Sequence, residues 1–526
     1  MKKHSVLLLA LVLLLGWVFD FLFWQKSLGV NFAIFLTLCL LAGFILLRTL
    51  GLKPAAKSLW LLLPFVFFIA ITCVRREPVT QLSARFFSLF SLGLLAVSYA
   101  SGRWVQYSLF DYGYKFYTLA LGVFVRPFHF FRQSRQDFVL SGKKIETAPI
   151  KPVIRGVLIA IPIVIFFSML LASADVVFSQ KMGDLFDSFS LEKFPETIIR
   201  LIIILIVGYL LLGIFLHAAA QSEDDTLVGD RKPVIKRFLG FTEAAIVLGS
   251  VVALFLLFVI VQFRYFFGGE VNIGVEGYTY SEYARSGFSE LIAVAFFSLV
   301  MVLGLSIITR RETSRQAKIY SGFSIALLAL VIVILVSAYQ RLALAIDWHG
   351  FSRLRLYPRI FLIWVGLLFV TVIVLEIFRW ERFFALAALV ACIGFTASLG
   401  VLNVDATIVR HNVNRAIAGK HFNVNHLTTL SPDAVPALYA EFMDPSLPVK
   451  IQEGVGAALM CFVNSDLFLD DPLPDWRSAN FSDWRAFASL DNVDDLLQGY
   501  TVISSRDPFL VQTPNLERYN CSQTWR

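Results

Sequence analysis

Long, uninterrupted apolar runs recur along the chain as far as residue 402. About eleven of them approach the roughly 17–25 residues that a helix needs to cross a bilayer. Because lipid offers a backbone no hydrogen-bond partners, such a run is stable there only as a helix. We expect spans near residues 6–24, 30–47, 58–74, 86–100, 153–173, 198–219, 241–263, 288–309, 319–340, 361–378 and 383–402. The sequence therefore predicts an all-α fold, a polytopic transmembrane helical bundle of about 11 spans.

Composition supports lipid as part of the solvent. Apolar residues make up 57% of the chain and charged residues 16%, against roughly 45–50% and about 25% in soluble domains. The net charge of +8 combines an excess of about 14 positive charges in the first 402 residues with a balance near −6 from Asn403 onward. A basic excess in a membrane region reports loop orientation and headgroup contact. With no basic–aromatic groove, we expect the lipid bilayer and no nucleic acid as a partner.

Basic residues gather in alternate loops, and this pattern predicts the orientation of the chain. The most basic loop covers about residues 126–155, and residues 310–318 form another, whereas the segment 174–197 is rich in acids. We place these basic loops and the N-terminus in the cytoplasm. An odd number of spans then places the C-terminal domain outside the cytoplasm.

One segment departs from this scheme. Residues 104–125 are apolar enough for a span, but they contain Asp111 and Lys115 among several tyrosines. Counting the segment as a span would move the loop 126–155 to the wrong side. We therefore predict an interfacial amphipathic helix there.

The chain divides into a transmembrane helical domain, residues 1–402, and a small, mostly helical soluble domain, residues 403–526. Helical patterns cover about residues 405–418, 432–443, 449–463 and 481–490, and a β-prone run follows at 500–503. Cys461 and Cys521 are the two cysteines of this domain. They form a candidate disulfide if the domain faces an oxidising compartment.

Ionisable residues in or beside spans are functional candidates, because burying a charge in lipid is costly. Asp175 stands at the outer end of the fifth span. Before the eighth span, Glu282 fits a capping box with Thr279 and can pair with Arg285. Glu290 lies deeper, and capping does not explain it. A structural role at a helix end is the alternative for each.

A third group lies between the ninth and tenth spans. It consists of Arg341, Asp347, His349, Arg353, Arg355 and Arg359. Arginines in an outer loop run against the positive-inside rule, so we expect them to have partners. These partners are either the carboxylates named above or an anionic ligand or lipid headgroup, since arginine binds carboxylate and phosphate in a bidentate way.

Signals for metals and cofactors are weak. His411, His421 and His426 fit no standard spacing, so we expect no metal site. The chain has no Walker loop, no Rossmann glycine fingerprint, no His-Glu-x-x-His and no Gly-x-Ser-x-Gly. We therefore expect no cofactor.

Several short motifs resemble one family. They are Leu-Ala-Ser-Ala-Asp at 171–175, Tyr-Phe-Phe-Gly-Gly at 265–269, Tyr-Ala-Arg-Ser-Gly-Phe-Ser-Glu-Leu at 283–291, Arg-Leu-Arg-Leu-Tyr at 353–357, residues 403–415 and 431–438. Together they look like the signatures of an uncharacterised bacterial multi-pass membrane family, known only as a domain of unknown function, over about residues 150–490. The resemblance implies an inner-membrane location and the same architecture, with no activity to carry over.

With no catalytic pattern, we favour a non-enzymatic envelope scaffold or sensor whose external domain contacts a protein partner. Two alternatives stay open. A transporter of a small or anionic solute would suit charges beside glycine-interrupted helices. A membrane enzyme acting on a lipid-linked substrate would use Asp175 or Glu290 as a base and the arginines to hold phosphate.

Overall fold

A computed structural model describes residues 5–140, 164, 167, 168, 171, 194–222, 226–228, 237–267, 288–465, 475–491, 493, 496–504 and 509–521. These residues divide between two compact units. The first unit comprises Met1–Lys26, Phe35–Lys53 and Tyr117–Ser222, and the second comprises Ser27–Ile34, Pro54–Phe116 and Glu223–Arg526. Each unit is described by itself.

The transmembrane helices agree with the sequence prediction. Ten described helical stretches are long and apolar enough to cross a membrane. They comprise α1 (Ser5–Phe23), α2 (Val30–Thr49), α3 with α4 (Ala56–Leu59 and Leu62–Val74), α5 (Pro78–Ser98), α9 (Phe194–Gln221), α10 (Phe241–Phe267), α12 (Phe288–Ile308), α13 (Ser314–His349), α14 (Arg353–Ile377) and η5 with α15 (Glu381–Phe383 and Phe384–Leu402). The remaining expected span, the fifth in the sequence at 153–173, lies outside the described residues except for positions 164, 167, 168 and 171. The polytopic all-α architecture is confirmed.

The first unit is built around the packing of α1 against α9. Gly16 permits close approach, because a Cβ atom there would stand 2.5 Å from the carbonyl oxygen of Ile204. In the same pair of helices, the guanidinium of Arg200 contacts the buried carboxylate of Asp20, with Nη2 2.7 Å from Oδ2. Sequence reasoning missed this ion pair, although an aspartate inside the first apolar run was its signal.

Helix α6 (Leu109–Leu140) differs in length from the segment we expected at 104–125. It follows a short 3-10 turn, η2 (Arg103–Gln106), and continues through Pro127 into the first part of the basic segment 126–155. It is not among the stretches apolar enough to span. Its interfacial position stays a prediction.

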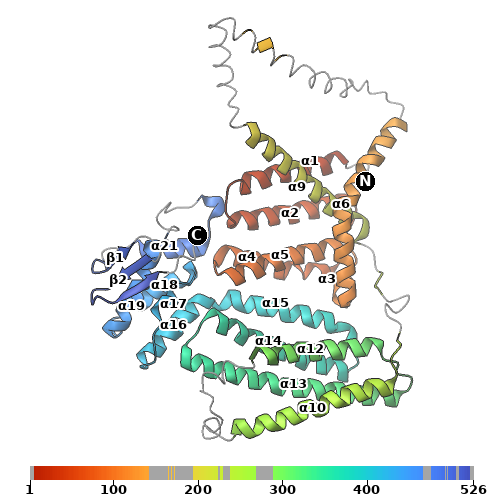
Figure 1. The fold of residues 1–526 in the computed structure, drawn as a ribbon. Helices are drawn as coiled ribbons and strands as arrows, with labels where there is room; N and C mark the ends of the chain where they lie inside the picture. The colour runs from red at the N-terminus through yellow and green to blue at the C-terminus, as the bar shows by residue number, and fades with distance from the viewer. Residues whose placement is uncertain are drawn as a thin grey trace. The chain divides into compact units, whose positions relative to one another are not determined.

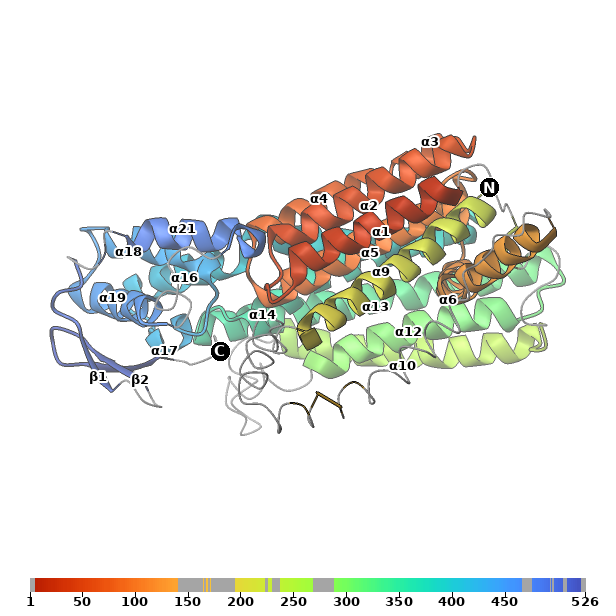
Figure 2. The same cartoon turned by 90° about the horizontal axis from the view of Figure 1, so that it is seen from above.

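The membrane helices of the second unit lie side by side, as two perpendicular views show (Figures 1 and 2). Helix α13 is the longest, with 36 residues, and it extends for roughly 54 Å at 1.5 Å per residue. Leu327, Leu328 and Val331 on α13 are fully buried. A helix of this length exceeds the roughly 30 Å hydrocarbon core, so it projects beyond the bilayer.

The segment that we predicted as the C-terminal domain, and for which we keep that name, begins at Asn403, whose left-handed backbone (φ 46°) turns the chain out of α15. The Asn403 side chain accepts a hydrogen bond from the amide of Ala406 and so caps the next helix. The helices of the domain are α16 (Val404–Ile417), α17 (Val424–Leu427), η6 (Pro432–Ala434), α18 (Val435–Phe442), α19 (Val449–Val463), η7 (Trp476–Ser478) and α21 (Phe481–Leu490). The four helical patterns seen in the sequence correspond to α16, η6 with α18, α19 and α21.

Three short antiparallel strands complete the domain in the order β1 (Thr501–Ser504), β2 (Phe509–Gln512) and β3 (Arg518–Cys521). The β-prone run noted at 500–503 corresponds to β1. Cys461 on α19 forms a disulfide with Cys521 on β3, with Cα atoms 5.5 Å apart. This bond ties the last strand to the helical part of the domain.

The C-terminal domain lies at one end of the second unit's helices, where α4, α13 and α15 finish and α5 and α14 begin (Figures 1 and 2). We call this the domain end. At the opposite end, α12 finishes beside the start of α10, and Leu239 forms a backbone bridge with Thr309. Alternation of the helices therefore brings the turns at 75–77, 350–352 and 403 to one level.

Candidate functional site

Four buried carboxylates occupy the junction between the membrane helices and the C-terminal domain. They belong to Glu77, Asp405, Asp433 and Asp483. Each stands at the cap or in the first turn of a helix, where the helix dipole favours negative charge. A buried charge also needs hydrogen-bond donors, and each of the four has at least one partner from an element distant in the sequence.

Arg353 and Asp405 join α14 to α16. The guanidinium contacts the carboxylate in a bidentate way, with Nε 2.8 Å from Oδ1 and Nη2 2.5 Å from Oδ2. Asp405 Oδ2 also accepts a hydrogen bond of 2.7 Å from the amide of Ser431. One carboxylate thus holds a membrane helix and the turn before α18 together.

Arg76 makes a second link, from the end of α4 to α21. Its Nη2 lies 2.8 Å from Oδ2 of Asp483. The adjacent Asp433 accepts hydrogen bonds from the amides of Arg76 (2.7 Å) and Glu77 (2.8 Å). Burial raises the pKa of Asp433, against the opposing effect of its hydrogen bonds from Ser482, Arg76 and Glu77.

Glu77 completes the network from the membrane side. Its carboxylate caps α5 by accepting hydrogen bonds from the amides of Val79 (2.9 Å) and Thr80 (2.7 Å). The hydroxyl of Tyr357 on α14 donates to the same carboxylate. Glu77 therefore connects the starts of two membrane helices.

Asn480 adds uncharged hydrogen bonds to this junction. Its side-chain amide donates to the carbonyl oxygens of Thr72 and Arg75, both at 3.0 Å, while its oxygen caps α21. Asn480 is thus the N-cap of α21, and Asp483 in the first turn pairs with Arg76.

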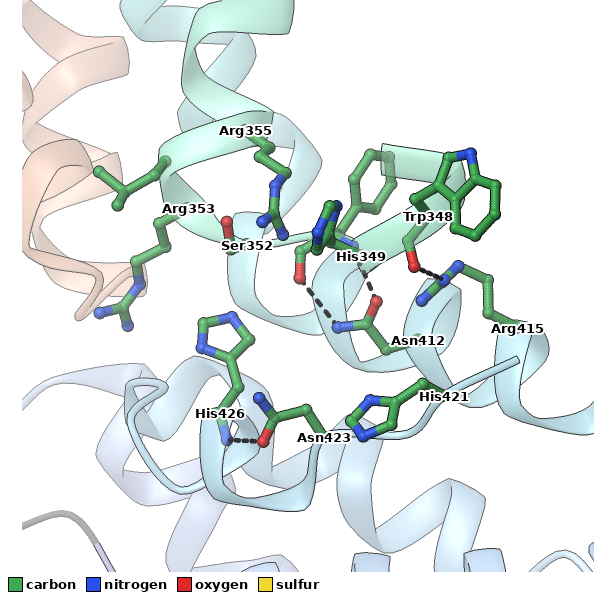
Figure 3. A pocket seen from close by; sticks show the side chains of 12 residues that line it. Trp348, His349, Ser352, Arg353, Arg355, Asn412, Arg415, His421, Asn423 and His426 are labelled. Carbon is green, nitrogen blue, oxygen red and sulfur yellow. Dashed lines mark hydrogen bonds between the residues drawn. The ribbon is translucent and has the colours of Figure 1, made fainter. Parts of the chain in front are cut away.

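A cavity of about 560 Å³ opens beside this network (Figure 3). We call it the junction pocket. Three arginines and three histidines contribute to its wall, and none of the described residues that line it carries a carboxylate. The lining residues are Trp348, His349, Phe351, Ser352, Arg353, Leu354, Arg355, Asn412, Arg415, His421, Asn423 and His426.

Hydrogen bonds and close packing hold the wall formed by the end of α13. Asn412 donates to the carbonyl of Phe351 (2.9 Å) and accepts from its amide (2.8 Å). Gly350 has φ 80°, and a Cβ atom there would stand 2.5 Å from both Asn412 Oδ1 and Arg415 Nη1. The turn at 350–352 therefore requires glycine, and it fixes the position of Arg415.

Arg415 is 8% exposed. Its Nη2 donates to the carbonyl oxygens of Asp347 (2.9 Å) and Trp348 (3.0 Å). Its Nε is buried and has no hydrogen-bond partner among the described residues. Arg415 thus brings a positive charge to the pocket wall and keeps one donor unused.

His426 lies on the facing wall and, like Arg415, has one ring or side-chain nitrogen that makes no hydrogen bond within the described ranges. Its Nε2 atom is buried without a hydrogen-bond partner in the described part of the chain. Burial lowers the pKa of His426, as do the charges of Arg353 and Arg355, while Asp405 opposes the shift. The imidazole is therefore held neutral near pH 7 in a strongly positive surrounding.

A second, smaller cavity of about 200 Å³ lies on the other side of α16. Arg75, Arg410 and Arg485 line it together with Asp433. A carboxylate already balances part of its charge. Within the described ranges, no group of three His, Cys, Asp or Glu side chains is placed to hold a metal ion.

The structure brings together part of the predicted polar cluster. Arg353 and Arg355 line the junction pocket, and the backbone carbonyl of Asp347 accepts a hydrogen bond from Arg415 of the pocket wall. Arg341 lies earlier in α13 than the pocket residues, and Glu290 is exposed in the first turn of α12. Asp175, Glu282 and Arg285 lie outside the described residues.

Arg353 has a partner other than the carboxylates that the sequence suggested. Arg353 pairs with Asp405, a residue that sequence reasoning treated as an ordinary helix start. Arg359 donates from Nε to the Tyr339 hydroxyl at 3.0 Å and lies over the Tyr339 and Phe351 rings. Sequence reasoning also missed Arg76, Asp433 and Asp483, whose signal was a charged residue at the end of a span or the start of a helix.

Comparison with known proteins identifies a family and no more. A family model described as "Domain of unknown function (DUF4153)" matches residues 62–441. The match begins earlier than the region over which the motifs resemble a family, and it includes the turn at 75–77 and most of the junction. No curated protein and no solved structure matches the chain.

Proposed function

Because the chain belongs to the DUF4153 family, a domain of unknown function, we propose a function from the junction itself. The protein is a non-enzymatic scaffold or sensor of the bacterial envelope. Its helices span the inner membrane and hold the C-terminal domain in one fixed position outside the cytoplasm. The domain presents its surface to a protein partner.

The buried ion-pair network is the observation that carries this proposal. A flexible linker after α15 would suffice to tether a domain that acts alone. Here Asp405 and Asp483 are instead buried against arginines of the membrane helices. Buried ion pairs add little net stability, but they penalise any arrangement that leaves one charge unpaired. Such a network suits a domain whose orientation relative to the helices matters.

Charge distribution supports the proposed sidedness. At the opposite end of the second unit, Arg310, Arg315 and Lys318 are exposed, as the positive-inside rule expects of a cytoplasmic face. The disulfide between Cys461 and Cys521 fits an oxidising compartment at the domain end. Both observations favour the domain outside the cytoplasm.

Sidedness is tested by reporters fused at residues 140, 345 and 526, one type active only in the cytoplasm and one only outside it. We expect a cytoplasmic signal at 140 and external signals at 345 and 526. Residue 345 lies near the end of α13 that contacts the domain. A cytoplasmic signal at 526 would overturn the external scaffold.

The scaffold role is tested by a photo-crosslinking residue introduced at Val449 or Leu516, which are exposed on the C-terminal domain. Leu63, exposed on α4, is the matched control within the bilayer. We expect a discrete protein adduct from the two domain positions in living cells, and none from Leu63. We also expect Asp405→Asn to reduce the adduct severalfold while the chain stays in the membrane. An adduct that is absent, or that Asp405→Asn leaves unchanged, would contradict a domain held in place for its partner.

A further inference from the structure

Helix α21 carries an inference that does not depend on the scaffold role. It belongs to the C-terminal domain, yet two large aromatic side chains, Phe481 and Trp484, are exposed on it. We propose that this face of α21 is a docking surface for the lipid headgroups at the domain end. Phe481 and Trp484 insert among the headgroups, and Arg485 contacts anionic lipid. The membrane surface thereby holds the domain in addition to the junction.

The exposed residues of α21 follow helical spacing. Counted from the start of the helix they occupy positions i, i+3, i+4 and i+7, as Phe481, Trp484, Arg485 and Ala488, so they share one side. Asp483 and Ala486, on the other side, are buried. The outer side of a surface helix is normally polar, but Phe481 is 52% exposed and Trp484 is 63% exposed. Large apolar side chains grouped in this way mark an interaction site.

Hydrogen bonds fix the level of this face relative to the membrane. The side-chain amide of Asn480, which precedes Phe481, donates to the carbonyl oxygens of Thr72 and Arg75, both at 3.0 Å. These two carbonyls lie on either side of Val74, where the span formed by α3 and α4 ends. Helix α21 therefore begins beside the end of a membrane helix (Figures 1 and 2).

The length of one helical turn keeps both aromatic residues within the interface. A helix rises 1.5 Å per residue, so the Cα atom of Trp484 stands at most about 4.5 Å farther from the span end than that of Phe481. The headgroup region beyond the hydrocarbon core is roughly 5–8 Å thick on each side. Tryptophan is enriched at this depth, because its ring is apolar and its N–H can still find a polar partner. The level of α21 therefore matches a headgroup contact.

Charge on the same face favours anionic lipid. Arg485 is exposed next to Trp484, and it also borders the smaller cavity together with Arg75 and Arg410. Along α21, whose residues are all described, the exposed side contains no acid, because Asp483 is buried in an ion pair. Arginine near an anionic membrane surface is attracted to it. The face thus combines apolar insertion with electrostatic attraction, as interfacial helices do.

Contact is tested with a benzophenone amino acid placed at position 484 or 481 of the full-length protein, and at 516 as the control. Leu516 is 72% exposed and follows β2, which lies on the side of the domain away from the membrane helices (Figures 1 and 2). The protein is reconstituted into nanodiscs of phosphatidylcholine and phosphatidylglycerol in equal amounts and irradiated. Mass spectrometry of the intact chain then identifies and counts the lipid adducts. Trp484 is the more exposed of the two residues, so position 484 keeps the test decisive even if the label at 481 prevents folding.

We expect lipid adducts from positions 481 and 484 and none from 516. Adducts at 484 with phosphatidylglycerol should exceed those with phosphatidylcholine about fivefold, which corresponds to about 1 kcal/mol for one arginine near an anionic surface. Arg485→Gln should remove this preference, whereas Arg518→Gln, which removes an exposed charge from β3, should keep it.

Three results would overturn the proposal. The first is that position 484 gives no more lipid adduct than position 516. The second is that the preference for phosphatidylglycerol is missing in the wild type or persists in Arg485→Gln. The third is that the label at 484 in living cells gives a protein adduct in place of lipid, because the face then binds a protein or a second copy of the chain.

Discussion

The two ends of the helices in the second unit use arginine in opposite ways. At the domain end, Arg76 and Arg353 are partly buried and paired with the buried carboxylates of Asp483 and Asp405. At the opposite end, Arg310 and Arg315 are exposed to solvent. Arg311 there lies 3.7 Å from the half-exposed Glu381. Arg76 and Arg353 are thus structural partners at one end, whereas Arg310 and Arg315 are surface charges at the other.

This difference explains why the sequence around Arg353 conflicted with the positive-inside rule. The rule describes exposed charges in short loops that resist translocation. Arg353 begins α14 and has its charge balanced by Asp405 in the folded protein, and Arg359 is held between the Tyr339 and Phe351 rings. Span ends with buried partners are therefore poor markers of orientation, and the exposed basic residues at 310–318 are the better ones.

The largest expected effect comes from breaking the buried pair at the domain end. Arg353→Met leaves Asp405 buried and unpaired, which costs about 3–5 kcal/mol in comparable cases. We expect a loss of this size in the free energy of unfolding of the C-terminal domain. It is measured by denaturant titration in micelles, with tryptophan fluorescence as the signal.

The control for this experiment is Lys450→Met, which removes an exposed pair with Glu517. Exposed ion pairs contribute roughly 0–1 kcal/mol, so this variant is expected to unfold almost as the wild type does. Equal losses in the two variants would remove the distinction between paired buried arginines and surface charges.

The disulfide is the next largest contribution. Cys461 and Cys521 are separated by 60 residues, and loss of a native disulfide from a small domain typically costs about 2–5 kcal/mol. We expect Cys461→Ser to lower the unfolding midpoint of the domain by a corresponding amount, and reductant to do the same to the wild type.

Thiol labelling in intact cells relates this result to sidedness. If the domain end faces an oxidising compartment, Cys461 and Cys521 react with a maleimide only after reduction and denaturation. Cys39, Cys73 and Cys392 are the free cysteines. After denaturation without reductant, we expect the maleimide to label these three only. Labelling of all five cysteines without reductant would show that the pair is reduced in the cell.

Exposed charges at the opposite end should affect orientation and not stability. The triple variant Arg310→Gln, Arg315→Gln and Lys318→Gln is expected to change the free energy of unfolding by no more than about 0.5 kcal/mol, as is usual for surface substitutions. A reporter at residue 345 should nevertheless lose part of its external signal, because α13 has lost the positive charges that precede it. Arg353→Met, in contrast, should leave that signal intact. Reversal of these two results would show that the paired arginines orient the chain.

The spans were predictable and the junction was not, for a physical reason. Hydropathy over about 20 residues is a local property, so the sequence alone identifies α1, α13 or α15. Arg353 and Asp405 are 52 positions apart, and Arg76 and Asp483 are 407 apart, so no local pattern connects them. All four buried carboxylates also stand at helix starts, where capping and the helix dipole already account for an acid.

Candidate pocket residues were predictable only in part for the same reason. Arg353 and Arg355 were recognisable because two arginines directly precede a span. Arg415, His421 and His426 belong to α16 and to the segment after it, where polar residues are ordinary. The position of Arg415 depends on Gly350 and Asn412, which fix the turn between α13 and α14, and the two histidines reach the pocket from a different part of the chain.

The smallest expected effect is a pH dependence confined to the domain end. The lowered pKa of His426, caused first by burial and then by Arg353 and Arg355, means that the folded protein binds a proton less readily than the unfolded chain. The stability that this histidine contributes is therefore complete above its unfolded pKa of about 6.5, and it is lost as the pH falls below that value. His411 changes in the same direction, through burial and the charge of Arg415.

In His426→Gln, the free energy of unfolding of the C-terminal domain should fall less steeply as the pH is lowered. The stability of the first unit should stay unchanged. Groups facing His426 are Arg353 and Arg355 of α14 and Asp405 of α16, along with Thr429 of its own segment. Unfolding of the wild type and of His426→Gln is measured by denaturant titration from pH 7.5 to 5.5. If acid destabilises both proteins equally, His426 does not cause the loss, and its lowered pKa has no consequence for the stability of the domain end.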